Sequence, residues 1–142
     1  MTPELRSKRV LQLRFPARAA ELKRIREAVR EGVAGCGCSA KSTADIVLAI
    51  DEACQNIIRH AYCGESDDVI ELEVEHRGDG LVFSLADHAP AIDPNQVKPR
   101  ELDDVRPGGL GTHFIRRVMD EVEFKRPASG RGNLLRMVRR ID

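Results

Sequence analysis

The clearest indication of the fold comes from twelve consecutive residues, Asp51-Glu52-Ala53-Cys54-Gln55-Asn56-Ile57-Ile58-Arg59-His60-Ala61-Tyr62. Three polar residues here, Glu52, Asn56 and His60, are spaced four apart, so they follow one another along one line of a helix surface. Apolar residues at helical spacing form a separate stripe, made of Ile46, Ile50, Ala53, Ile57 and Ala61. The pattern predicts an amphipathic helix that begins after Ser39 or Ser42 and ends near Tyr62, with Gly64 as its terminator.

The polar line of this helix carries groups that suit phosphate chemistry. A carboxylate such as Glu52 can act as a general base, and an amide oxygen such as that of Asn56 suits a hard magnesium ion. Ala49 lies beside the line, where its small side chain would leave room for a ligand against the helix. The same spacing is also typical of a solvated polar face, so the residues alone leave both interpretations open.

The segments around this helix alternate between strand and helix patterns, in an order that predicts an α+β fold. We expect an edge strand over Arg9–Phe15, a helix from Ala17 to about Val33, a hairpin of Val69–His76 and Leu81–Asp87, a short helix ending near Met119, and strands over Val122–Lys125 and Asn133–Arg140. Residues 1–142 are expected to form one domain. Its architecture would be a two-layer α/β sandwich with a mixed, mostly antiparallel sheet covered by helices on one face.

Composition restricts the function classes. Hydrophobic residues make up 42% and charged residues 32% of the 142 residues, which is typical of a folded globular protein. Lys+Arg and Asp+Glu are 23 each, so no overall positive field favours nucleic acid. No apolar stretch is long enough for a membrane span and the N-terminus is polar, so we expect a cytoplasmic protein. The four cysteines lack zinc-site spacing and are expected to be mostly structural thiols.

Two further segments carry groups suited to a nucleotide. Asp87 ends a predicted strand, and its carboxylate could accept a hydrogen bond from the exocyclic amine of adenine or could cap a turn. The glycine-rich residues 108–112 run into a helix, where bare amides form a site for phosphates. This loop lacks the Lys-Ser/Thr ending of a Walker-A motif and does not open a βαβ unit. A P-loop and a Rossmann fold are therefore disfavoured.

Three motifs, in this order, resemble the anti-sigma regulatory serine/threonine kinase family of the histidine-kinase-like ATPase superfamily. They are Glu-x-x-x-Asn-x-x-x-His-Ala-Tyr at 52–62, Asp-x-Ala-Pro-x-Ile-Asp-Pro at 87–94 and Gly-Gly-Leu-Gly-x-x-x-Ile-Arg at 108–116. The predicted order of helices and strands also matches that family's domain. The resemblance implies the histidine-kinase-like ATPase type of sandwich.

The resemblance also implies roles for individual residues. Glu52 would be the general base, Asn56 the magnesium ligand and Asp87 the group that recognises adenine. ATP and Mg²⁺ would be the cofactors, with residues 91–107 as a lid over ATP. The residues implied in nucleotide binding are Asn56, Arg59, His60, Asp87, Ala89, Ile92, Gly108, Gly109, Leu110, Gly111 and Thr112.

The activity implied is that of an ATP-dependent serine/threonine protein kinase in a partner switch. Such a protein binds a sigma factor in one state and phosphorylates an anti-anti-sigma protein in another. Similar proteins form homodimers, so a second copy is also an expected partner, whereas nucleic acid and membrane are not.

Two alternatives remain beside this interpretation. The first is a non-catalytic ATP- or ADP-sensing interaction module, which the departure at Ala89 favours, because the family usually has a glycine there. A glycine can be needed for a positive φ or for close approach of backbone to ligand. The second is the ATPase half of a histidine kinase, which is disfavoured because no dimerisation helix with a phospho-accepting histidine fits before Arg9.

Overall fold

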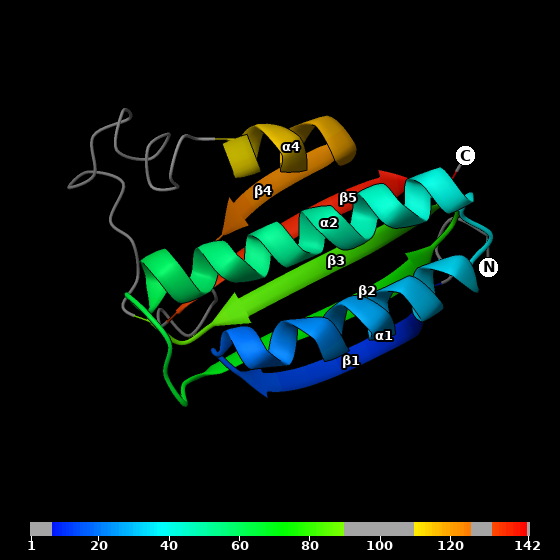
Figure 1. Ribbon diagram of the computed structural model, residues 1–142. Coiled ribbons are helices and arrows are strands. Elements are labelled where there is room, and N and C mark those ends of the chain that lie inside the picture. The colour runs from blue at the N-terminus through cyan, green and yellow to red at the C-terminus, as the bar shows by residue number, and fades with distance from the viewer. Residues whose placement is uncertain (1–6, 90–109, 126–131, 142) are drawn as a thin grey trace.

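A five-stranded sheet and a set of helices make up the protein in the computed structural model. The structure describes residues 7–89, 110–125 and 132–141 and the side chains of these residues except 110–112. Its elements are β1 (Ser7–Pro16), a 3-10 turn η2 (Ala19–Glu21), α1 (Leu22–Ala34), α2 (Ala40–Asn56), a π-helix η3 (Ile57–Ala61), β2 (Val69–Arg77), β3 (Gly80–Asp87), α4 (Leu110–Val118), β4 (Glu121–Lys125) and β5 (Asn133–Arg140) (Figure 1).

The sheet has the strand order β1-β2-β3-β5-β4. Every pairing between the described strands is antiparallel, so the predicted mixed sheet is wrong in this respect. β2 and β3 are antiparallel because a tight turn at Gly78 joins them. β5 also runs antiparallel to both of its neighbours, β3 and β4. The predicted position of β1 at an edge is confirmed.

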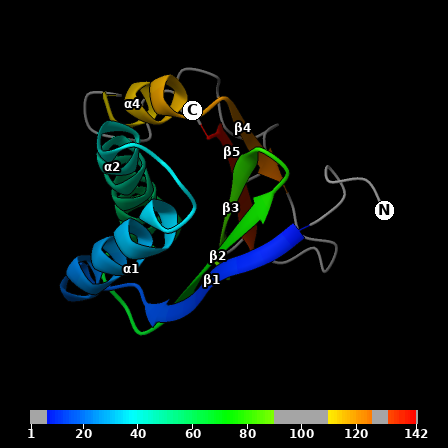
Figure 2. The same cartoon turned by 90° about the vertical axis from the view of Figure 1, so that its right-hand side faces the viewer.

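Helices cover one face of the sheet, and Figure 2 shows α1, α2 and α4 together on that side. The alternation of each strand explains this arrangement, because every second side chain points toward the helices. The largest of these inward side chains are fully buried: Phe15, Ile70, Leu72, Phe83, Leu85 and Met137. The α+β two-layer architecture expected from the sequence is confirmed.

The first helix begins later than expected, whereas the second begins at one of the two positions predicted for it. The first helix begins as a 3-10 turn at Ala19 rather than at Ala17, because the backbone of Ala17 bonds to the 66–68 segment: its N–H donates to Asp68 O at 2.8 Å and its carbonyl accepts from Ser66 N at 3.0 Å. The second helix begins after Ser39, whose Oγ accepts a hydrogen bond from Ser42 N at 3.1 Å.

The end of the second helix is unusual, because its last five residues, Ile57–Ala61, form a π-helix. Tyr62 N donates to Ile57 O at 3.0 Å, which closes the wider turn, and Gly64 N donates to Ile58 O at 2.7 Å. Cys63 then adopts a left-handed conformation with φ 57° and Gly64 follows with φ 128°. Such π-turns inside helices occur often at functional sites. None of the described helices is long and apolar enough to cross a membrane.

One arginine connects three elements on the inner side of the sheet. Arg139 of β5 donates to Val118 O at the end of α4 at 2.6 Å and to Ser42 Oγ in the first turn of α2 at 2.9 Å. A cation at a helix C-terminus is favourable, because the terminal carbonyls lack partners within the helix. Arg139 therefore fixes the position of α4 relative to α2.

We predict that Arg139→Met lowers the free energy of unfolding by about 2 kcal/mol, because hydrogen bonds from a charged donor are lost inside the fold. Urea denaturation measures this change. Arg136→Met is the matched control: it lies on the same strand but on the opposite face of the sheet, and should change the free energy by no more than about 0.5 kcal/mol. Equal midpoints of urea denaturation for the two variants would contradict the assigned role of Arg139.

Candidate functional site

The second half of α2 carries the two residues expected to act on phosphate. Glu52 is partly exposed, with 26% of its side chain accessible. Asn56 follows one turn later, and its Oδ1 atom is buried and has no hydrogen-bond partner among the described residues. A buried acceptor without a donor is costly, so this oxygen is suited to a cation or to a ligand donor.

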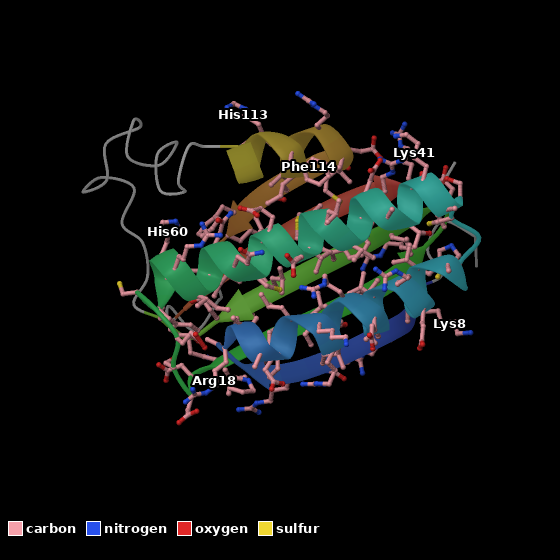
Figure 3. The ribbon with its side chains drawn as sticks, viewed as in Figure 1. Lys8, Arg18, Lys41, His60, His113 and Phe114 are labelled. Atoms are coloured by element: carbon pink, nitrogen blue, oxygen red, sulfur yellow. The ribbon has the colours of Figure 1, made fainter. Side chains whose placement is uncertain are left out.

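Ala49 does not have the role expected for it. It is completely buried within the hydrophobic core. Ala49 therefore offers no open surface to a ligand. His60 lies in the π-helix and is half-buried; Figure 3 shows it at the end of the helical segment.

A chain of polar contacts runs from α1 to Glu52. Arg26 Nη1 of α1 donates to Asp51 Oδ1 at 2.9 Å, and Gln55 Nε2 donates to Asp51 Oδ2 at 2.7 Å. Gln55 Oε1 in turn accepts a hydrogen bond from Arg59 Nη2 at 2.7 Å, and the same Nη2 lies 4.0 Å from Glu52 Oε1. Sequence reasoning missed this chain, because the contact from α1 requires the packing of two helices.

Asp87 lies at the end of β3 and is 4% exposed. Its Oδ1 atom accepts hydrogen bonds from Ala89 N at 3.0 Å and from Asn133 Nδ2 at 2.9 Å. The bond to Ala89 is the turn cap considered from the sequence. Burial raises the pKa of Asp87 above its ordinary value, although the two hydrogen bonds and nearby His88 act in the opposite direction. The carboxyl group is thus held in a defined orientation inside the protein.

The backbone constraint beside Asp87 comes from Gly132, not from residue 89. Gly132 has φ +78°, and a Cβ atom there would lie 2.1 Å from the carbonyl oxygen of Asp87. Only glycine permits both features. Ala89 is buried and has no positive φ, since Cys63 is the only non-glycine residue in the described part of the chain that does. In this conformation residue 89 therefore does not have the positive φ that is one of the two possible reasons for a glycine there.

Tyr62 joins the helical motif to the Asp87 segment. Its hydroxyl donates to Val69 O at 2.6 Å and accepts a hydrogen bond from His88 N at 2.7 Å. Burial raises the pKa of Tyr62, so the hydroxyl keeps its proton and remains a donor. Two motifs that are separate in the sequence are thus connected directly. Tyr62 and Asn133 were not expected among the site residues.

The glycine-rich segment can be placed only from its helical end. α4 begins at Leu110 and continues through Gly111 and Thr112, while Ile92, Gly108, Gly109 and the predicted lid over residues 91–107 lie outside the described residues. His113 is exposed, and Phe114 is partly buried against the core (Figure 3). α4 packs beside α2, which carries Glu52 and Asn56.

A family model described as the histidine kinase-like ATPase domain matches residues 15–139. The chain belongs to the histidine kinase-like ATPase family. The order of elements described above is therefore that of a histidine kinase-like ATPase domain.

Curated relatives of this histidine kinase-like ATPase domain are named as protein kinases. The serine/threonine-protein kinase BtrW of Bordetella bronchiseptica is 33% identical over 92 residues, which cover 62% of this chain and 65% of BtrW. The serine-protein kinase RsbW of Listeria innocua is 30% identical over 96 residues, covering 62% and 61%. RsbW of Bacillus pumilus is 27% identical over 126 residues, covering 82% and 78%. The chain spans slightly less than two thirds of the first two relatives.

Two solved structures share the fold of the domain. The RsbU and RsbW domains of a Mycobacterium tuberculosis protein match with a TM-score of 0.65 and 19% identity, covering 92% of this chain and 31% of that one. The SiaB–SiaC complex of Pseudomonas aeruginosa matches with a TM-score of 0.64 and 17% identity, covering 92% and 90%. At these identities the similarity concerns the fold.

We predict that Gly132→Ala lowers the free energy of unfolding by about 3 kcal/mol, because the added methyl meets the Asp87 carbonyl and the backbone must keep a positive φ. Gly37→Ala is the matched control. Gly37 has φ +94° but no atom within 4 Å of the added Cβ, so only the conformational cost of about 1 kcal/mol applies. Similar losses in both variants would show that the contact with Asp87 is unimportant.

The raised pKa of Asp87 predicts the pH dependence of stability. An acid that holds its proton more tightly in the folded protein stabilises the fold most below its ordinary pKa, and this contribution is lost as the pH rises through the raised pKa. Asp87→Asn should therefore gain stability relative to wild type as the pH increases from about 4 to 7. Denaturant titrations at several pH values measure this difference, and a difference independent of pH would contradict the prediction.

Proposed function

We propose that this protein is an ATP-dependent serine/threonine protein kinase that acts as an anti-sigma factor and phosphorylates an anti-anti-sigma protein. The observation that carries the proposal is the pairing of a partly exposed carboxylate, Glu52, with an amide oxygen one helical turn away, Asn56 Oδ1, which has no hydrogen-bond partner among the described residues. Tyr62 connects this helix to the backbone of His88, the residue that follows the buried Asp87. The kinase names of the curated relatives support the same activity.

In the proposed complex Asp87 accepts a hydrogen bond from the adenine amine, and Asn56 Oδ1 coordinates Mg²⁺. The described residues contain no cluster of three or more His, Cys, Asp or Glu side chains, so this ion would be held by Asn56 together with the phosphates of ATP, as is usual for Mg²⁺. When bound, the ion neutralises charge on the phosphates. The amides of Gly109 and Gly111 are proposed to lie close to the same phosphates.

The role proposed for Glu52 is to orient a serine or threonine hydroxyl of the partner protein. The hydroxyl oxygen attacks the γ-phosphorus, the bond from that phosphorus to the β–γ bridging oxygen breaks, and ADP leaves. Glu52 takes the hydroxyl proton as the new bond forms. Phosphoryl transfer requires little more of the protein than this positioning and charge stabilisation.

The proposed partners are a sigma factor, an anti-anti-sigma protein and a second copy of this chain. One structural neighbour, SiaB, is recorded in a complex with SiaC, and another is an RsbW domain solved with an RsbU domain. A regulator of sigma factors acts where transcription occurs, so we place the protein in the cytoplasm. Residues 1–142 are proposed to form one domain for this purpose.

We predict that Glu52→Gln lowers the rate of phosphate transfer by about two to four orders of magnitude while leaving ATP binding nearly intact, as expected for loss of a general base. The measurement incubates protein, radiolabelled ATP and Mg²⁺ with the anti-anti-sigma-like protein encoded nearest to it, and follows label on that partner. Glu27→Gln, an exposed glutamate of α1, is the matched control. Transfer at the wild-type rate in Glu52→Gln would remove the base assignment.

Asn56→Ala separates the magnesium role from the base role. This variant should lose the Mg²⁺ dependence of nucleotide binding, which calorimetric titration of ADP with and without Mg²⁺ measures. If the wild-type protein binds ATP but labels no partner, the non-catalytic ATP- or ADP-sensing module replaces the kinase as the better description.

A further inference from the structure

Arg59 is a residue of the site for which the family resemblance implies only a nucleotide contact. Its side chain is 38% exposed and lies on the same side of the helical segment as Glu52, seven residues earlier. Its Nη2 atom donates to Gln55 Oε1 at 2.7 Å and lies 4.0 Å from Glu52 Oε1. The cation is therefore fixed by an amide and directed toward the proposed base.

The distance between Arg59 Nη2 and Glu52 Oε1 bears on what Arg59 can do. At 4.0 Å the two groups attract each other, but the distance is too long for a hydrogen bond. The oxygens of Glu52 therefore keep their capacity to accept a hydrogen bond from a substrate hydroxyl. A closer, bidentate pair would hold the carboxylate more tightly but would occupy the atoms that the reaction needs.

The contacts that hold Arg59 in place extend through Gln55 and Asp51 to α1. Gln55 donates to Asp51 Oδ2 at 2.7 Å, and Arg26 of α1 donates to Asp51 Oδ1 at 2.9 Å. Asp51 is the least exposed of the charged members, with 13% of its side chain accessible. The amide of Gln55 is consequently oriented, with its nitrogen toward Asp51 and its oxygen toward Arg59.

Stability is not the main consequence of this chain of contacts. Glu52 and Arg59 are both partly exposed, and ion pairs in contact with solvent add little to the free energy of folding. What the contacts do restrict is the direction of the Glu52 side chain, because Arg59 is held on one side of it. Orientation of this kind affects rates more than stability.

We propose that Arg59 is a positioning residue for Glu52, and that Gln55, Asp51 and Arg26 hold Arg59 in place. The catalytic consequence rests on the proposed kinase function, while the physical coupling of Arg59 to Glu52 does not. This role differs from the nucleotide contact that the resemblance implies for Arg59. It also connects the proposed base to α1 through Arg26.

Kinetics provide the first test. Arg59→Met should lower kcat for phosphate transfer about ten- to a hundredfold, with KM for ATP changed by no more than about twofold and the melting temperature nearly unchanged. Arg59→Lys keeps the charge and should recover part of the loss. Arg24→Met is the matched control, because it removes another exposed Arg–Glu pair, Arg24–Glu21 at 2.8 Å on the α1 side. A large rise in KM for ATP with kcat unchanged would overturn the proposal in favour of a nucleotide contact.

An NMR measurement tests the coupling without any activity. The Nε–Hε resonance of Arg59, assigned by its absence in Arg59→Met, should move in Glu52→Gln and in Gln55→Leu but not in Glu27→Gln. An unmoved resonance in Glu52→Gln overturns the proposal, and so does wild-type kcat in Arg59→Met. If the resonance moves as expected and the wild-type protein transfers no phosphate to its partner, the positioning of Glu52 stands and the proposed kinase function fails.

Discussion

The second helical segment has to satisfy two demands at once, and the remainder of the structure is arranged around it. One side of α2 and η3 is buried against the sheet through Ile46, Ile50 and Ile57, while Glu52 and Arg59 on the other side stay in contact with solvent. α1 and α4 pack beside it, and the sheet lies beneath. Burial on one side fixes the helix rigidly, and this rigidity gives the polar side a defined geometry.

The fold must also keep a carboxylate inside the protein at the end of β3. Asp87 is buried, which is unfavourable for a charge, and the cost is reduced by hydrogen bonds from Ala89 N and Asn133 Nδ2. Gly132 allows the start of β5 to approach the Asp87 backbone closely. A group kept buried at such a cost, and oriented by its neighbours, is a common feature of binding sites.

Local patterns predicted most of the fold, because apolar residues recur every second residue in a half-buried strand and every three or four residues in an amphipathic helix. The alternation in Val69–Arg77 and the apolar stripe around Ile46 and Ile50 are examples. Glu52, Asn56 and Asp87 could be singled out because their residue types and positions in motifs suit a nucleotide. The contacts of Tyr62, Asn133 and Arg26 could not, because each joins segments distant in the sequence. The π-helix was also missed, since no residue type marks a change in hydrogen-bond register.

The strand order also determines when the protein can complete its sheet during synthesis. β5 follows the other described strands in the chain, yet it lies between β3 and β4. Until residues 132–140 have left the ribosome, β4 has no neighbour in the sheet. The inner face of β3 with Phe83 and Leu85 then lacks part of its cover, and Asp87 lacks the hydrogen bond from Asn133. A nascent chain at that stage has an unpaired strand edge and apolar surface, which are the features that chaperones bind and that promote aggregation.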